Sequence, residues 1–169
     1  MNNHRGFSLI ELMIAVALFA TLITIGVPSF ITLTESNRVT ADTNDLISAL
    51  SLARSEALKR GQRISLCSST DGASCADDTD WTTGWIVFFD SDGDGTVDAG
   101  DGDEIFRAWE AVEGDTTVTG SAEFVTYQGN GSASTFNLNL TIPDNAEQSR
   151  RICISLSGYN WVNRPSSAC

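Results

Sequence analysis

The chain has 169 residues, with 22 acidic against 10 basic side chains and a net charge of −12. This charge, of which 14 acids fall between positions 71 and 115, argues against nonspecific binding to phosphate backbones. The single histidine is His4, so the chain beyond it has no imidazole for general-base or nucleophilic catalysis. We therefore expect a protein that is not an enzyme.

The first 34 residues predict a short basic leader followed by a membrane-spanning helix. Arg5 precedes an apolar run, and no charged side chain occurs from Leu12 to Thr34. A helix of this length, at about 1.5 Å per residue, spans the roughly 30 Å hydrocarbon core of a bilayer. Glu11 interrupts the run near its start, where a carboxylate is costly and usually has a partner. Since the next base is Arg38, we expect the leader to be cytoplasmic and the remainder exported.

The second half of the same helix is expected to be amphipathic. Apolar residues recur there at helical spacing, namely Ile31, Val39, Leu46, Ile47, Leu50, Ala53, Ala57 and Leu58. Lys59, Arg60 and Gly61 form a typical helix ending, with bases in the last turn and then glycine. The pattern predicts one helix from about Ser8 to Arg60.

After Gly61 the chain changes to short alternating segments separated by Gly, Asn, Asp and Ser clusters. The expected strands are 63–67, 84–90, 104–109, 116–119, 124–127, 135–140 and 151–156. The predicted fold class is α+β, with a long N-terminal helix packed on an antiparallel β-sheet.

Four cysteines in an exported domain indicate disulfides. Of the three possible pairings we favour Cys67–Cys75 and Cys153–Cys169, because each closes a short loop. Zinc is not expected, since the chain has no C-x-x-C motif.

An acidic turn between two expected strands has the spacing of a calcium loop. With Asp90 as position 1, oxygen ligands fall at the EF-hand positions: Asp90, Asp92, Asp94, Thr96, Asp98 and Asp101, with Gly95 at position 6. An EF-hand joins helices and has glutamate at position 12, whereas this loop joins strands and has aspartate there. The alternative is a solvated hairpin tip. No cofactor is required, and calcium would be structural and weak.

The segment Gly6-Phe7-Ser8-Leu9-Ile10-Glu11 resembles the class III leader of type IV pilins and type II secretion pseudopilins. The resemblance implies that prepilin peptidase cuts between Gly6 and Phe7 and that Phe7 is then N-methylated. Glu11 would pair with the amino terminus of a neighbouring subunit during assembly. The implied organisation is a leader at 1–6, a hydrophobic helix and transmembrane anchor at 7–34, and a globular pilin domain at 35–169. That domain would comprise a helix at 35–60 and a β-rich part at 61–169.

The globular part resembles the GspH/FimT family. The matching segments are 52–57 (LARSEA), 81–90 (WTTGWIVFFD), 104–107 (EIFR), 125–131 (VTYQGNG) and 151–158 (RICISLSG). The resemblance implies a minor pilin of the FimT/FimU type that primes or caps type IV pilus assembly without catalysis. The alternatives are a minor pseudopilin of type II secretion or a pilus-tip receptor for DNA uptake.

The implied partners are other minor pilins or pseudopilins, the major pilin, prepilin peptidase and the inner-membrane assembly platform. The implied location is the inner membrane, crossed once with the C-terminal domain in the periplasm, and later the tip of a pilus or pseudopilus.

DNA binding is the less favoured function. Some FimT-type proteins are described as DNA receptors that use a basic G-R-x-R turn, but this chain has Gly158-Tyr159-Asn160-Trp161 there and lacks both arginines. The groups that remain for DNA are Arg150, Arg151, Tyr159, Trp161 and Arg164.

Overall fold

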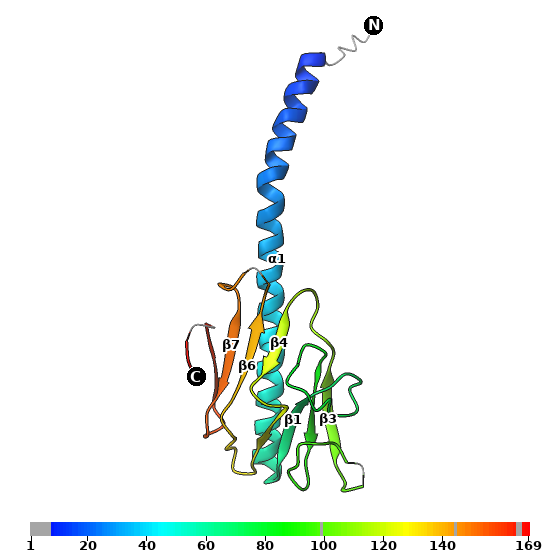
Figure 1. Cartoon of the computed structure of the whole chain (residues 1–169), viewed down its shortest axis with the longest axis vertical. Coiled ribbons are helices and arrows are strands. Elements are labelled where there is room, and N and C mark those ends of the chain that lie inside the picture. The colour runs from blue at the N-terminus through cyan, green and yellow to red at the C-terminus, as the bar shows by residue number, and fades with distance from the viewer. Residues whose placement is uncertain (1–7, 99, 144, 165–166) are drawn as a thin grey trace. The chain divides into compact units, whose positions relative to one another are not determined.

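The computed structural model describes residues 8–98, 100–143, 145–164 and 167–169, apart from the side chains at 25, 26, 28 and 29. One helix precedes all strands in the described chain (Figure 1). The elements are α1 (Leu9–Arg60), β1 (Ile64–Ser68), β2 (Trp85–Phe89), β3 (Glu104–Trp109), β4 (Thr117–Gly120), β5 (Phe124–Tyr127), β6 (Phe136–Thr141), β7 (Arg150–Ile154) and β8 (Asn160–Asn163).

The helix α1 is 52 residues long, as the sequence predicts. It ends at Gly61, whose N–H donates to the carbonyl oxygen of Ala57 at 2.8 Å and whose φ is +65°. This left-handed conformation is the one that glycine adopts most readily after a helix. The chain divides into two compact units, residues 1–37 and 38–169, and α1 contributes to both.

The strands form two four-stranded antiparallel sheets, where the sequence analysis expected one. The first sheet has the order β3-β2-β1-β5, and the second sheet has the order β4-β6-β7-β8. Of the strands labelled in Figure 1, β1 and β3 belong to the first sheet, and β4, β6 and β7 belong to the second. The strand β8 was not predicted; the residues expected to form a turn there pair with β7, with Trp161 opposite Cys153.

The core lies between the second half of α1 and the two sheets. The buried apolar helix residues are Val39, Leu46, Ala49, Leu50, Ala53 and Ala57, which share one face at spacings of three, four and seven. Each sheet contributes its alternate residues; Leu138, Leu140 and Ile152 of the second sheet are fully buried. Ile31 and Leu58 were predicted to lie on the packed face, but both are more than half exposed, so that part of the prediction is wrong.

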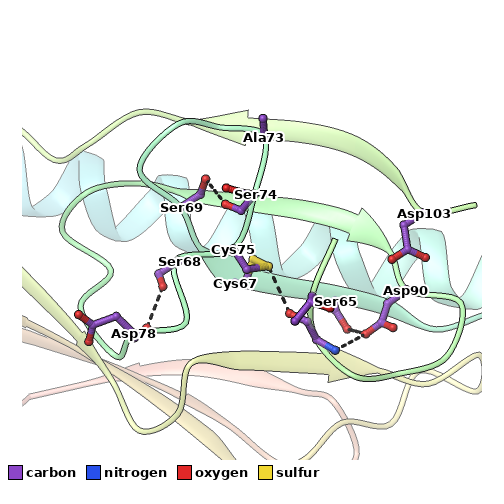
Figure 2. Close-up of a disulfide and its surroundings, with 12 residues drawn as sticks. Ser65, Cys67, Ser68, Ser69, Ala73, Ser74, Cys75, Asp78, Asp90 and Asp103 are labelled. Atoms are coloured by element: carbon purple, nitrogen blue, oxygen red, sulfur yellow. Dashed lines mark hydrogen bonds between the residues drawn. A yellow bond between two sulfur atoms is a disulfide. The ribbon is translucent and has the colours of Figure 1, made fainter. Parts of the chain in front are cut away.

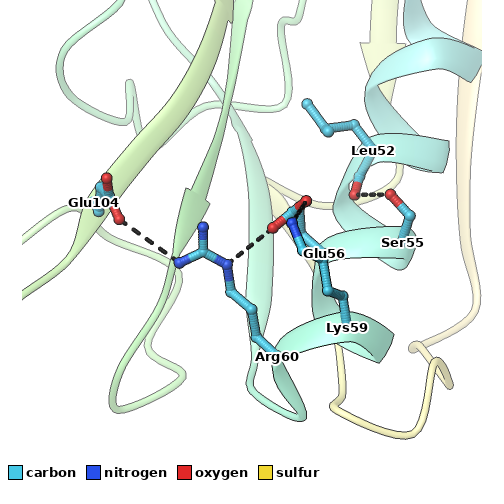
Figure 3. Close-up of polar contacts among 6 residues, drawn as sticks. All are labelled: Leu52, Ser55, Glu56, Lys59, Arg60 and Glu104. Atoms are coloured by element: carbon cyan, nitrogen blue, oxygen red, sulfur yellow. Dashed lines mark hydrogen bonds and ion pairs between the residues drawn. The ribbon is translucent and has the colours of Figure 1, made fainter.

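A cluster of charged side chains connects the end of α1 with the first sheet (Figure 3). The Glu56 carboxylate accepts from Arg60 at 2.9 Å and from Lys59 at 3.2 Å, and Arg60 lies 3.7 Å from a carboxylate oxygen of Glu104. The hydrogen bonds from Arg60 and then Lys59 lower the pKa of Glu56. The Arg60 guanidinium also lies 4.4 Å from the ring centre of Phe106, which adds a cation–π contact to this corner.

Candidate functional site

The start of α1 presents Glu11 on an open helix surface. The carbonyl oxygen of Ser8 accepts from the N–H groups of Glu11 and Leu12, both at 3.1 Å, so Glu11 lies in the first turn. An acid is favourable there because the helix dipole is positive at its N-terminus. No residue that the structure describes pairs with its carboxylate. The predicted cleavage and methylation residues, Gly6 and Phe7, lie outside the described residues.

The first unit of the chain exposes an unusual amount of apolar surface. Its exposed large side chains are Leu9, Ile10, Leu12, Met13, Ile14, Val16, Leu18, Phe19, Leu22, Ile23, Val27, Phe30, Ile31 and Leu33. A surface of this kind marks a site that another apolar phase or protein covers. Within the described ranges, no helix has both the length and the apolar composition needed to cross a membrane. The anchor expected at 7–34 therefore stays a prediction.

The acidic loop after β2 brings three of its six predicted calcium ligands together. Ligand oxygens of Asp90, Asp92 and Asp94 lie within 4.8 Å of one another, with Asp90 buried and the other two exposed. The Asp90 carboxylate accepts from the N–H groups of Gly93 at 2.6 Å and Gly95 at 3.2 Å. It also accepts from the Ser65 hydroxyl at 2.6 Å, a contact shown in Figure 2. These bonds hold the loop around the Asp90 carboxylate.

The remaining predicted ligands are not in this group. The Thr96 hydroxyl donates to Asp94 at 2.8 Å and to Asp98 at 3.1 Å. The bonds from Thr96, first its N–H and then its hydroxyl, lower the pKa of Asp94. Asp101 does not reach the group; Asp103 instead accepts from the N–H groups of Ser91 and Asp98, both at 3.0 Å. The twelve-residue spacing pointed to Asp101, and only the fold shows that Asp103 lies across the loop.

Calcium binding at this loop is expected to raise the melting temperature. For a Kd of about 1 mM, 10 mM calcium adds roughly 1.4 kcal/mol, or about 4 °C. The measurement is a thermal melt in calcium against chelator, for the protein and for Asp92→Asn with Asp94→Asn. Glu147→Gln, an exposed acid outside the loop, is the charge control. An unchanged melting temperature in the unaltered protein would count against the site.

A cleft of about 310 Å³, here called the Asp42 cleft, lies between α1 and the ends of β2 and β3. It is lined by Arg38, Asp42, Trp85, Trp109 and Glu113, among others. A carboxylate oxygen of Asp42 and both indole nitrogens are buried without a hydrogen-bond partner among the described residues. Burial, followed by repulsion from Asp45 and Glu113, raises the pKa of Asp42 to about 6, although Arg38 opposes the shift.

The Asp42→Asn variant is expected to be more stable than the unaltered protein at pH 8, by about 1–2 kcal/mol. The folded pKa of about 6 lies above the ordinary 3.8, so the folded protein binds this proton more tightly than the unfolded chain. This group therefore makes the protein more stable as the pH falls from about 7 to 4, and asparagine removes that gain. Denaturant unfolding at pH 8 and pH 4 measures the difference. Asp45→Asn, which removes a neighbouring charge, should show a smaller effect.

Both expected disulfides, Cys67–Cys75 and Cys153–Cys169, are present. The first lies beside the acidic loop: Sγ of Cys75 is 3.2 Å from the carbonyl oxygen of Gly95 (Figure 2). The second joins Cys169 to Cys153 in β7.

The arginines and the aromatic residues considered for DNA binding make different contacts. Arg150 donates to the carbonyl oxygens of residues 147, 148 and 149, and Arg151 donates to Asn139 at 2.6 Å and to the carbonyl of Ser167 at 3.0 Å. Tyr159 and Trp161 stack on each other, with ring centres 6.2 Å apart. Arg164 is exposed. Two of the three arginines are thus held by the chain's own oxygens, which leaves little free positive charge for a phosphate backbone.

Two family profiles match this chain. The family profile of the type II transport protein GspH matches residues 42–158, and the prokaryotic N-terminal methylation motif matches residues 1–27. None of the curated protein sequences matches at a significant level.

Solved structures show the same fold. Two crystal forms of the type IV minor pilin FimU of Pseudomonas aeruginosa give TM-scores of 0.62 and 0.58 at 20% and 19% identity. They cover 81% and 77% of this chain and 96% of the FimU chain. The minor pseudopilin EpsH of the type 2 secretion system of Vibrio cholerae gives 0.51 at 11% identity, over 77% of this chain and 99% of EpsH. The α+β fold is therefore that of a type IV pilin. Since the GspH profile spans more than half of its length, this chain belongs to the GspH family of minor pilins and pseudopilins, found in type IV pili and type II secretion systems.

Proposed function

We propose that this protein is a minor pilin that primes or caps the assembly of a type IV pilus and catalyses no reaction. The observation that carries the proposal is the start of α1, where one carboxylate, Glu11, stands in an exposed apolar helix surface. The methylation motif at residues 1–27 supports processing of the same segment. Cleavage after Gly6 and methylation of Phe7 are part of the proposal.

The chemistry of Glu11 fits an assembly contact. Once the leader is removed, each subunit has a positively charged amino terminus four residues before its own Glu11. Within a filament core of low dielectric, that amine and the carboxylate of a neighbour attract strongly, and neither is stable alone. The exposed apolar side chains around Glu11 would be covered first by lipid and then by the helices of neighbouring subunits.

The proposed location is the inner membrane, spanned once, with residues 35–169 in the periplasm until the subunit enters the filament tip. Family members assemble with other pilins or pseudopilins, so the proposed partners are minor pilins, the major pilin, prepilin peptidase and the assembly platform. A minor pseudopilin of type II secretion is the second candidate, supported by the GspH profile and by the similarity to EpsH. The greater similarity to FimU favours the pilus.

Deletion of the coding sequence is expected to reduce surface pili at least tenfold, as counted by electron microscopy. The wild-type copy should restore them. A copy with Glu11→Ala should be cleaved normally, as shown by the mass of the mature protein, yet fail to restore pili. Glu35→Ala, which changes the next acid of the same helix, is the matched control and should restore them.

Each outcome has a distinct meaning. Normal pili in the deletion strain would overturn the pilus role, and an accompanying loss of protein secretion would establish the pseudopilin role. Normal pili with the Glu11→Ala copy would remove Glu11 from the mechanism while leaving the pilus role intact.

A further inference from the structure

The second sheet has a groove that the assembly role does not use. Its volume is about 840 Å³, and it lies where β6 begins and β7 ends. This is the end of the domain at which α1 also ends, since Arg54 donates to the carbonyl oxygen of Ser157 at 3.0 Å. The volume is in the range of pockets that hold small organic ligands.

The groove is lined by both apolar and polar side chains, none of them charged, although the chain has a net charge of −12. Within the described chain, the Thr135 hydroxyl, the Asn137 side-chain NH₂ and the Trp161 indole N–H donate to no protein group; Thr135 is exposed, and Asn137 and Trp161 are half-buried. The Ser121 hydroxyl accepts from the backbone N–H of Asn137 at 3.0 Å and keeps its own proton free to donate. The groove therefore offers neutral donors, together with hydroxyls that both donate and accept.

An aromatic surface borders these groups. Tyr159, just before β8, and Trp161, within β8, are two residues apart, and their rings stack with planes 15° apart. β8 is an edge strand of the second sheet, so nothing in the sheet covers this pair from beyond it. Tyr159 is 61% exposed and Leu156, in the turn before it, is 68% exposed. Exposed rings beside unpaired polar groups suit a ligand that has one apolar face and many hydroxyls.

Nucleic acids and sugars both stack on aromatic rings, but they differ in charge. A nucleic acid strand needs cations for its phosphates, but Arg150 and Arg151 are bound to oxygens of this chain. A sugar needs no cation, because its ring C–H groups lie on an aromatic face and its hydroxyls bond to amides and hydroxyls. The groove thus matches a neutral saccharide and disfavours a polyanion.

We infer that this groove, with the Tyr159–Trp161 pair, binds a neutral oligosaccharide. A pyranose ring lies against the aromatic pair, and its hydroxyls bond to Asn137, Thr135 and Ser121. The inference goes beyond the proposed assembly role and does not depend on it.

The experiment is calorimetric titration of the full-length protein in lauryldimethylamine oxide, a detergent without a sugar head group. The probes are maltotriose, cellotriose and the trimer of N-acetylglucosamine. At least one is expected to bind with a Kd of about 1 mM or tighter. Trp161→Ala and Asn137→Ala should each weaken that binding tenfold or more, whereas Trp109→Phe, at an aromatic residue outside the groove, should leave it unchanged.

A second variant tests the inference even if Trp161→Ala fails to fold. Tyr159→Ala changes an exposed side chain, so it should fold normally and still weaken binding at least threefold. The inference is overturned if no trisaccharide binds at 10 mM, or if the Trp161 and Tyr159 variants bind as the unaltered protein does. Binding of an oligothymidine strand without binding of any sugar would also overturn it and assign the aromatic pair to single-stranded nucleic acid.

Discussion

Replacing Gly158 with alanine is expected to destabilise the protein by about 3 kcal/mol and lower its melting temperature by roughly 10 °C. Gly158 has a φ of +72°, and its N–H donates to the carbonyl oxygen of Ser155 at 2.8 Å, which closes the turn between β7 and β8. A Cβ at this position would lie 1.9 Å from the carbonyl oxygen of Gly131. Because that atom belongs to the backbone, the two segments would have to move apart.

Gly61→Ala is the matched control. Gly61 has a similar φ of +65°, but a Cβ there would meet no atom within 4 Å. Its replacement should cost only the strain of a left-handed alanine, about 1 kcal/mol. Thermal or denaturant unfolding of both variants separates backbone strain from the collision with Gly131. Equal losses for the two variants would show that the segment around Gly131 moves aside freely.

Removal of the Cys153–Cys169 disulfide by alanine at both positions is expected to cost about 3 kcal/mol. The bridge closes a loop with a sequence separation of 16, which restricts the unfolded chain. It also holds the tail across the second sheet, where Arg151 donates to Ser167 and Asn163 donates to Ala168. The loss should therefore include faster amide hydrogen exchange in β8, as well as a lower free energy of unfolding.

The corresponding Cys67–Cys75 double variant is the control for this effect. Its loop is shorter, with a separation of 8, and it lies at the first sheet. A loss of about 2.6 kcal/mol is expected from the loop length, without a change of hydrogen exchange in β8. Unchanged exchange in β8 when Cys153 and Cys169 are both replaced would contradict the role of the bridge in holding the tail.

Most strands of this protein follow from local sequence, whereas β8 depends on tertiary structure. The seven predicted strands are present within one or two residues, because alternating apolar residues and turn-forming residues are local signals. β8 has the sequence NWVN, in which two adjacent apolar residues are flanked by turn-forming asparagines, so it lacks the alternation that predicts a strand. Its pairing partner β7 and the disulfide at Cys169 decide its conformation, and both act across the fold.

The candidate sites divide in the same way. The position of Glu11 in an apolar helix start is a property of the sequence, since one turn of helix places it without distant contacts. The spacing of its acidic residues predicted the acidic loop. That Asp103, and not Asp101, accepts hydrogen bonds across the loop depends on where β3 begins. The raised pKa of Asp42 comes first from burial, then from Asp45 and Glu113; the burial and the approach of Glu113 depend on the fold and could not be anticipated from the sequence.

The long helix, the strand-rich second half and the family were predicted from the sequence, because periodicity and the leader motif are read along the chain. The sequence also favoured the disulfide pairing that the structure confirms. The division into two sheets, the burial of Asp42 and the groove beside Trp161 depend instead on tertiary contacts. These features arise where residues far apart in sequence meet, so their energies depend on long-range packing that no local pattern encodes.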